Sequence, residues 1–303
     1  MVEQIDFSPR HDVLIRGEDG TLLPMDVPYY ESEQIAPGTW KIRSDGDSQF
    51  LLEGTEQSIV IDSGYGAGNI RAYCQSLTKK PIHYIINTHD HFDHTANNAY
   101  FDAAYMTEET AALATIPFPS FAGIDFPRDY EKRIVRDGDI LDLGDRPLEM
   151  LFIPDHAPGS IAVLDHRERI LFAGDEIVPF FKKINSDVET VLEQFKRLRR
   201  RSGEYDVIWS APVQSPVSLS VLDTYIAAME AVMNGAEPKP GMGFSPQKGK
   251  EQDTRSTSGA VIYERFRARP EDMKVQEGAE TLVHLRLGDA SLIYRPDRIF
   301  KSK

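Results

Sequence analysis

Thr88-His89-Asp90-His91-Phe92-Asp93-His94-Thr95 carries the clearest signal in this sequence, and its spacing is His-x-His-x-Asp-His. It contains three of the eight histidines in the 303-residue chain. Neutral imidazole and carboxylate are the side chains that bind Zn²⁺, Mn²⁺ or Fe²⁺ at neutral pH. The stretch therefore predicts a metal site.

The spacing within this stretch suits two neighbouring ions. His89 and His91 are two residues apart, so an extended backbone points both side chains the same way, whereas Asp93 and His94 are adjacent and point apart. The stretch follows the apolar residues 81–87, which we expect to form a buried strand. Ligands at the end of a rigid strand are held better than ligands on a free loop.

Two later segments offer further ligands at predicted strand ends. His156 ends the strand expected within residues 147–153, and Asp175 ends the strand expected over residues 169–173. Either residue alone is typical of a turn or a cap. Together with the first stretch, both are predicted to be metal ligands.

These motifs resemble the metallo-β-lactamase superfamily in order and spacing over residues 33–235. The matching pieces are Ile61-Asp62-Ser63-Gly64, residues 89–94, Asp155-His156-Ala157-Pro158-Gly159-Ser160 and Phe172-Ala173-Gly174-Asp175. The resemblance implies an α/β fold of four layers, an αββα sandwich of two sheets between helices, which agrees with the alternation of predicted strands and helices.

The resemblance also implies ligand roles. His89, His91 and His156 would hold one metal ion, Asp93 and His94 would hold a second, and Asp175 would bridge the two. Asp62 would lie below the cluster and orient a ligating imidazole.

The chain departs from the family pattern at one point. The family has a further histidine after a late strand, but residues 206–215 contain none. Gln214, His284 or water would have to replace it, or the protein uses a single ion. The expected cofactor is therefore Zn²⁺, as one or two ions, with Mn²⁺ or Fe²⁺ as alternatives.

We predict three segments along the chain. Residues 1–32 form an N-terminal extension, residues 33–240 form the metallo-β-lactamase-like domain, and residues 241–303 form a linker and a small β-rich appendage with strands near 260–265, 281–287 and 291–294. Apolar residues repeat at helical spacing within residues 187–200 and 221–233, which predicts two helices with a core-facing stripe.

Composition restricts the partners. The chain has 34 basic and 48 acidic residues and a formal net charge of −14, so a nuclease is disfavoured because an acidic surface repels phosphate backbones. No apolar run approaches the roughly 18 residues that cross a bilayer. The N-terminus lacks the pattern of a secretory signal, so we expect a cytoplasmic protein that acts on a small molecule. The sequence leaves the oligomeric state open.

Aromatic segments near the predicted ligands are candidate pocket walls. Phe118 and Phe121 lie in the irregular segment 116–127, and Phe180 and Phe181 follow Asp175 closely. We interpret these four residues as substrate-binding, although they would equally pack under a long loop. Lys182 or Lys183 would then meet a carboxylate or polarise a carbonyl group of the substrate.

The predicted chemistry is hydrolysis. A bound metal ion lowers the pKa of its water from about 15.7 towards 7 and so supplies a hydroxide nucleophile. We expect it to cleave a carboxylic ester, thioester or lactone with an apolar portion, with Asp93 as the catalytic residue that orients the nucleophile or carries a proton. The alternatives are a mononuclear iron oxygenase and a degenerate metabolite-binding module; a β-lactamase is disfavoured because that activity is usually periplasmic.

Overall fold

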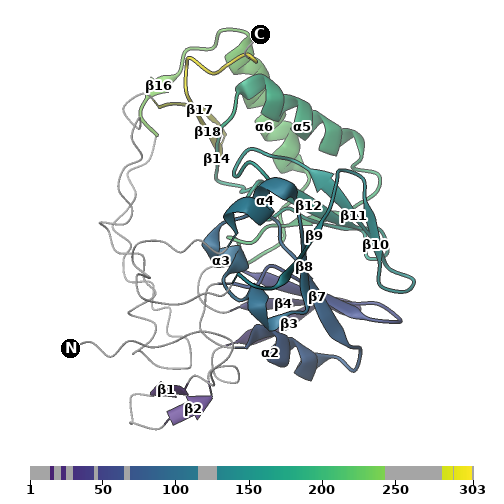
Figure 1. The fold of residues 1–303 in the computed structure, drawn as a ribbon. Coiled ribbons are helices and arrows are strands. Elements are labelled where there is room, and N and C mark those ends of the chain that lie inside the picture. The colour runs from purple at the N-terminus through teal and green to yellow at the C-terminus, as the bar shows by residue number, and fades with distance from the viewer. Residues whose placement is uncertain are drawn as a thin grey trace, which may run out of the picture.

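Two β-sheets pack face to face at the centre of the molecule, and helices cover both outer faces (Figure 1). The computed structural model describes residues 14–16, 22–24, 30–43, 47–64, 69–114, 128–242, 282–288 and 290–301. This arrangement confirms the predicted four-layer αββα sandwich. Outside it, β1 (Leu14–Arg16) and β2 (Leu22–Pro24) form a separate two-stranded sheet.

The first sheet has seven strands in sequence order, antiparallel from β3 to β6 and parallel from β6 to β9. Its strands are β3 (Glu31–Ala36), β4 (Thr39–Arg43), β5 (Gln49–Glu53), β6 (Ser58–Ile61), β7 (Ile82–Ile86), β8 (Ala103–Met106) and β9 (Glu131–Ile134). The sequence pattern misses β3, because this edge strand begins with four exposed residues and shows no apolar alternation.

The second sheet has five strands in the order β10-β11-β12-β13-β15. They are β10 (Ile140–Asp142), β11 (Pro147–Phe152), β12 (Ile161–Asp165), β13 (Ile170–Phe172) and β15 (Val207–Trp209). β12 runs antiparallel to both β11 and β13, so β11 and β13 point the same way.

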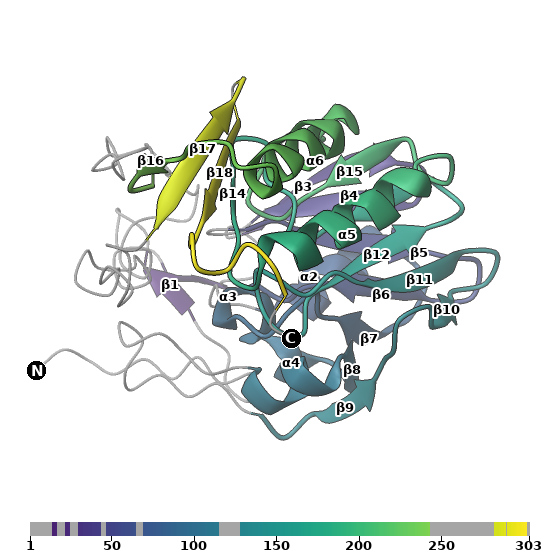
Figure 2. The same ribbon diagram turned by 90° about the horizontal axis from the view of Figure 1, so that it is seen from above.

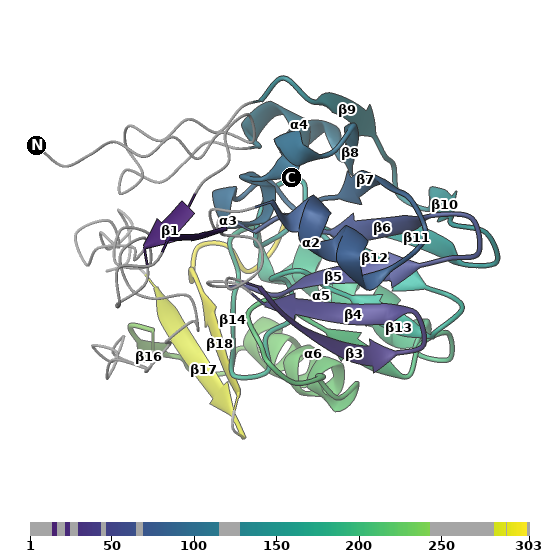
Figure 3. The ribbon, with the colours of Figure 1, turned by 90° about the horizontal axis from the view of Figure 1, so that it is seen from below.

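The helices divide between the two outer faces. α5 (Val188–Arg200) and α6 (Ser220–Met233) lie over the five-stranded sheet (Figure 2). α2 (Ile70–Leu77) lies over the seven-stranded sheet (Figure 3), and the short helices α3 (Phe92–Thr95), η1 (Asn98–Tyr100) and α4 (Glu108–Leu113) contribute to the same side.

Alternating side chains build the layers. On β5, Leu51 faces the α2 side, whereas Phe50 and Leu52 face the other sheet. On β12, Ala162 and Leu164 face α5 and α6, whereas Ile161 and Val163 face the first sheet. Strands buried on both faces read as nearly continuous apolar runs, which is the pattern from which they were predicted.

The two predicted helical stripes are confirmed. Five apolar residues of α5, spaced three and four apart, are buried: Val188, Val191, Leu192, Phe195 and Leu198. Asp187 caps this helix by accepting a 2.8 Å hydrogen bond from the backbone N–H of Thr190.

In the described part of the chain, no helix has the length and apolar character needed to span a bilayer.

The C-terminal strands join the main domain through a third sheet of order β14-β18-β17-β16. Its strands are β14 (Phe181–Lys183), β16 (Lys239–Pro240), β17 (Val283–Leu287) and β18 (Ala290–Tyr294). β18 pairs in parallel with β14, which follows Asp175, and its Leu292 and Tyr294 lie in the same core cluster as α5 and α6. The predicted strand near 260–265 lies outside the described residues.

The topology brings several strand ends to one edge of the sandwich. β6 and β7 are parallel and end just before Asp62 and His89, and β11 and β13 run the same way as each other and end before His156 and Asp175. The predicted ligands therefore gather where the carboxyl ends of strands from both sheets meet.

Candidate metal centre

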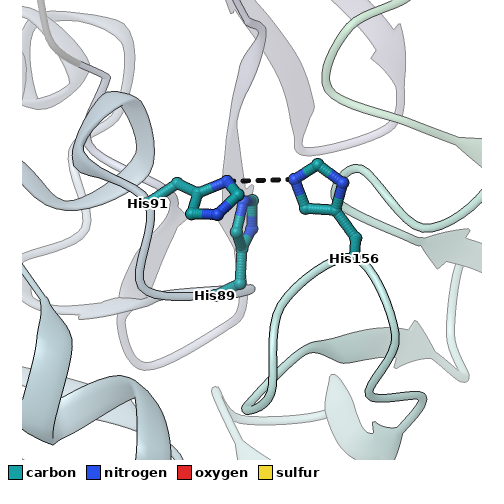
Figure 4. Close-up of side chains that lie close together, drawn as sticks. All are labelled: His89, His91 and His156. Atoms are coloured by element: carbon teal, nitrogen blue, oxygen red, sulfur yellow. Dashed lines mark hydrogen bonds between the residues drawn. The ribbon is translucent and has the colours of Figure 1, made fainter. Parts of the chain in front are cut away.

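Three histidines from the two sheets converge at this edge (Figure 4). His89 and His91 follow β7, His156 follows β11, and the three ring centroids lie 4.5 to 4.9 Å apart. One hydrogen bond of 3.0 Å joins His91 Nδ1 and His156 Nε2. Their nitrogen atoms lie within 4.8 Å of one another, so the three side chains can ligate one ion.

Asp175 lies between this histidine trio and the second half of the cluster. Its Oδ2 atom is 3.6 Å from His156 Nε2, and its Oδ1 atom is 3.5 Å from His94 Nε2. One carboxylate oxygen thus faces each half, which is the geometry of a bridging ligand. The backbone at Gly174 permits this approach, because a Cβ there would lie 2.7 Å from the Thr88 hydroxyl oxygen.

The second half of the cluster contains Asp93, His94 and a residue that the sequence did not predict, Asp47. Ligand atoms of these three side chains also lie within 4.8 Å of one another. Asp47 Oδ2 is 3.3 Å from His94 Nε2. Nothing in the sequence distinguishes Asp47 from an ordinary turn residue between two strands.

Asp62 lies below the cluster, where the family resemblance implies it. Its Oδ2 atom accepts a 2.9 Å hydrogen bond from His94 Nδ1–H, and its Oδ1 atom accepts a 2.8 Å bond from the backbone N–H of Thr88. Asp62 is almost fully buried and has a positive φ of 60°, an uncommon conformation for a residue other than glycine. It turns His94 so that Nε2 faces the carboxylates.

The histidine trio is held in the neutral form that binds metals. Burial and the neighbouring imidazoles lower the pKa of His89 well below its usual range. Burial, His91 and Lys182 lower the pKa of His156 to about 2. Neutral imidazole offers a lone pair to a cation without first losing a proton.

The carboxylates show the opposite effect. Burial and the charge of Asp47 raise the pKa of Asp175 well above its usual range, although His94 opposes this. Burial also raises the pKa of Asp93. A cation at this position would remove the repulsion that disfavours the ionised carboxylates.

Four buried atoms of the cluster, each on a potential ligand, have no hydrogen-bond partner among the described residues: His89 Nε2, Asp93 Oδ1, His94 Nε2 and Asp175 Oδ1. A buried polar group without a partner costs about 1–3 kcal/mol. The atoms left without partners are the ones that would face an ion, so the residues present fit a metal.

Behind His156 lies a buried group of charges that involves Lys182. Its ammonium group is 2.7 Å from Asp155 Oδ2 and 2.6 Å from Glu176 Oε2, and only 4% of its side chain is exposed. Burial in these ion pairs argues against the substrate contact proposed for Lys182, whereas the alternative residue, Lys183, is partly exposed. The sequence does not reveal the pairing, because the three residues come together only in the fold.

The other sequence candidates divide into three cases. Phe118 and Phe121 lie outside the described residues. Phe180 is 67% exposed and lines a cleft of about 730 Å³, whose lining residues include none of the metal cluster, and Phe181 lies beside it on β14.

Neither proposed substitute for the missing histidine lies in the cluster. Gln214 is exposed and lines the same cleft as Phe180. His284 lies on β17, where its Nδ1 atom is 3.0 Å from the carbonyl oxygen of Gly241. Among the described residues, Asp47 is the additional side chain at the second half of the cluster.

Comparison with known proteins agrees with the geometry. The family model of the metallo-β-lactamase superfamily matches residues 45–205. Acyl-coenzyme A thioesterase MBLAC2 of Homo sapiens is 30% identical over 160 residues, and the match covers 42% of this chain and 57% of that protein. Hydroxyacylglutathione hydrolase of Francisella tularensis is 26% identical over 162 residues, which are 52% and 59% of the two chains. This chain thus spans little more than half the length of these curated relatives.

Solved structures share the fold. A metallo-β-lactamase of Cronobacter sakazakii with a HARLDQ motif superposes with a TM-score of 0.52 and 22% identity over 67% of this chain and 92% of its own. One from Erythrobacter litoralis gives 0.51 and 14% over 71% and 98%. The family model covers just over half of the chain, and every residue of both halves of the cluster lies within the matched range. The chain belongs to the metallo-β-lactamase superfamily.

Proposed function

We propose that this chain is a metal-dependent hydrolase that cleaves a thioester or a carboxylic ester with an apolar acyl portion. The observation that carries the proposal is the position of Asp175, whose two carboxylate oxygens face the two halves of one ligand cluster. His89, His91 and His156 would hold one ion, and Asp93, His94 and Asp175 would hold or share a second. When bound, the metal supplies an activated water molecule and polarises the carbonyl group of the substrate.

The residues of the chain prepare the site in different ways. Asp62 fixes the ring of His94 through Nδ1. The side chain of His156 is 31% exposed, whereas that of His94 is 1% exposed, so a substrate would approach from the side of His156. Where the second ion is absent, Asp93 would be free to accept a proton from the attacking water and pass it to the leaving group. In the overall reaction, the C–S or C–O bond of the acyl group breaks, water supplies the new hydroxyl group, and a proton ends on the thiol or alcohol.

Two further observations support an acyl substrate. Two of the relatives carry names that refer to thioester chemistry, an acyl-coenzyme A thioesterase and a hydroxyacylglutathione hydrolase. The cleft that Phe180 lines also contains Pro179, Val213 and Leu287, and its size falls within the range of small-molecule pockets. We infer that it receives the apolar portion of the substrate.

The test combines metal analysis with a substrate panel. Protein purified without added metal is analysed for metal content and assayed on acyl-coenzyme A, acylglutathione, aryl ester and lactone substrates. His91→Ala should remove the first ion and the activity. His83→Ala is the matched control, because His83 lies on β7 and pairs with Asp102 at the surface.

Each alternative predicts a different result. Tight iron with oxygen consumption would replace the proposal by an oxygenase, and full metal occupancy without turnover on any substrate would replace it by a binding module. Unchanged metal stoichiometry in His91→Ala would overturn the ligand assignment.

A further inference from the structure

Asp47 lies at the second half of the cluster because of how two strands pair, which the residues next to it in the sequence do not indicate. Asp47 lies two residues before β5, and β5 runs antiparallel to β6. The start of β5 therefore lies at the edge where β6 ends. Asp62, which accepts a hydrogen bond from His94, follows β6 at the same edge. Asp47 approaches His94 from a segment other than those that carry the predicted ligands.

The distances place the carboxylate of Asp47 among potential ligand atoms. Its Oδ2 atom is 3.3 Å from His94 Nε2, and the side chain is only 15% exposed. A ligand atom from each of Asp47, Asp93 and His94 fits within a 4.8 Å group. His94 Nε2 thus faces Asp47 on one side and Asp175 on the other.

Backbone hydrogen bonds hold Asp47 at this position. The N–H of Ser48 donates a 2.8 Å bond to the carbonyl oxygen of Ala211, and the N–H of Ala211 donates a 3.0 Å bond to that of Gly174. Asp47 is therefore connected, through Ala211, to the residue before Asp175. Ala211 also belongs to the stretch 206–215, where the family histidine was expected and is missing.

The charges at this half of the cluster are unbalanced. Asp47, Asp93 and Asp175 bring three carboxylates together, and the ion pairs of Asp47 and Asp175 among the described residues are made with histidines rather than with lysine or arginine. Asp93 Oδ1 and Asp175 Oδ1 also lack hydrogen-bond partners there. A bound cation would supply the missing positive charge and the missing partner.

We propose that Asp47 is a ligand of the second metal ion, together with Asp93, His94 and the shared Asp175. This inference rests on the proposed metal-dependent function. It gives the two sites different donors: three imidazoles and a shared carboxylate at the first, and one imidazole with carboxylates at the second. Because carboxylate oxygen suits Mn²⁺ better than imidazole does, the second site favours Mn²⁺ relative to Zn²⁺ more than the first site does.

The test measures metal binding directly in the full chain. Wild-type protein, Asp47→Asn and Asp47→His are stripped with a chelator, reloaded with Mn²⁺ or Zn²⁺, and analysed by elemental analysis, calorimetric titration and the electron paramagnetic resonance of Mn²⁺. Asp206→Asn is the matched control, since Asp206 pairs with Arg169 at the surface. Thermal unfolding checks that the variants are folded.

The expected result is two ions in wild-type protein and in Asp206→Asn. Asp47→Asn should keep the first ion and bind the second at least about 10-fold more weakly. Loss of a residue that only hydrogen-bonds to a metal ligand already weakens metal binding by this factor. Asp47→His should restore the second Zn²⁺ but reduce the preference for Mn²⁺. It also keeps the test valid if Asp47→Asn does not fold.

Other results overturn the inference and separate it from the proposed function. Two equally tight ions in Asp47→Asn would exclude Asp47 as a ligand. A single ion in wild-type protein, lost in His91→Ala, would remove the second site and leave the hydrolase proposal intact. Wild-type protein that binds no metal would overturn both.

Discussion

Glu176 accepts a 2.6 Å hydrogen bond from the backbone N–H of His156. The same oxygen, Oε1, accepts a 3.0 Å bond from the backbone N–H of Asp155. Glu176 follows Asp175 directly in the sequence, so one buried carboxylate joins the segment that carries His156 to the segment that carries the bridging aspartate. The separation of two proposed ligands from different strands therefore depends on a residue that binds no metal.

Glu176→Gln tests this role of Glu176 as a positioning residue. The amide cannot carry the negative charge that pairs with Lys182, and its NH₂ group must face either that ammonium group or the backbone N–H donors. We expect about 10- to 100-fold weaker binding of the first ion and a loss of about 1–3 kcal/mol in the free energy of unfolding, since Lys182 keeps Asp155 as its counterion. Chelator competition and urea unfolding measure the two effects.

The matched control for this change is Glu193→Gln, since Glu193 pairs with Lys301 at the surface. It should leave both quantities nearly unchanged. Metal affinity that stays at the wild-type value in Glu176→Gln would show that the hydrogen bond to His156 has no positioning role.

Lys182→Met separates a structural role of Lys182 from the predicted contact with substrate. Without the ammonium group, Asp155 and Glu176 remain buried with no cation between them. Removing one partner of a buried ion pair costs about 3–5 kcal/mol, so unfolding should shift strongly. Lys183→Met, the neighbouring change on β14, should shift it much less. A large rise in KM with unchanged stability would support the substrate contact instead.

The sequence predicted the strands and the residues of the cluster other than Asp47 because most of those features are local, and the four layers followed from the family resemblance. Alternating or continuous apolar residues indicate a strand, and His89 to His94 display their chemistry within six positions. Asp47, Glu176 and Lys182 were missed or misread, because each acquires its role from residues that only the fold brings near. An aspartate before a strand and a lysine after an aromatic pair look like ordinary turn and surface residues.

The link between the C-terminal strands and β14 in the third sheet was missed for a similar reason. β14 has three residues and follows a Pro-Phe-Phe segment that is typical of a pocket wall, and its partner β18 lies more than 100 residues later. The strand signal of 291–294 was recognised, but neither segment shows that β18 pairs in parallel with β14 over that separation. The pairing nevertheless matters for the site, because it fixes the strand that carries Lys182.

Asp62→Asn tests the support below His94. The carboxylate accepts hydrogen bonds from His94 Nδ1–H and from the backbone and hydroxyl groups of Thr88, and an amide NH₂ cannot accept. We expect the second ion to bind about 10- to 100-fold more weakly, since partners that orient a ligating imidazole have this effect. Titration of metal-free protein measures it, and the first ion should be retained.

Asp102→Asn provides the comparison, because Asp102 is a half-exposed aspartate that pairs with Arg71 and His83. It should leave metal binding unchanged. Equal losses at both sites in Asp62→Asn would indicate a general disturbance of the edge rather than a specific effect on His94.

Asp165→Asn tests a connection between the two sheets that is independent of the metal. Arg146 and Asp165 are both fully buried, and Arg146 Nε–H donates a 2.9 Å hydrogen bond to Asp165 Oδ2. Arg146 Nη1 also donates to the carbonyl oxygens of Gly38 and Glu53 in the other sheet, at 2.6 and 2.9 Å. Neutralising Asp165 leaves the guanidinium buried without its counterion, which should cost about 3–5 kcal/mol in unfolding free energy.

The matched control, Asp206→Asn, breaks an exposed pair and should cost about 0–1 kcal/mol. Urea unfolding of the two metal-free variants measures the difference, and metal stoichiometry should be unaffected in both because neither residue approaches the cluster. Equal stabilities would mean that the buried pair contributes no more than the surface pair, and that the apolar residues between the sheets hold them together alone.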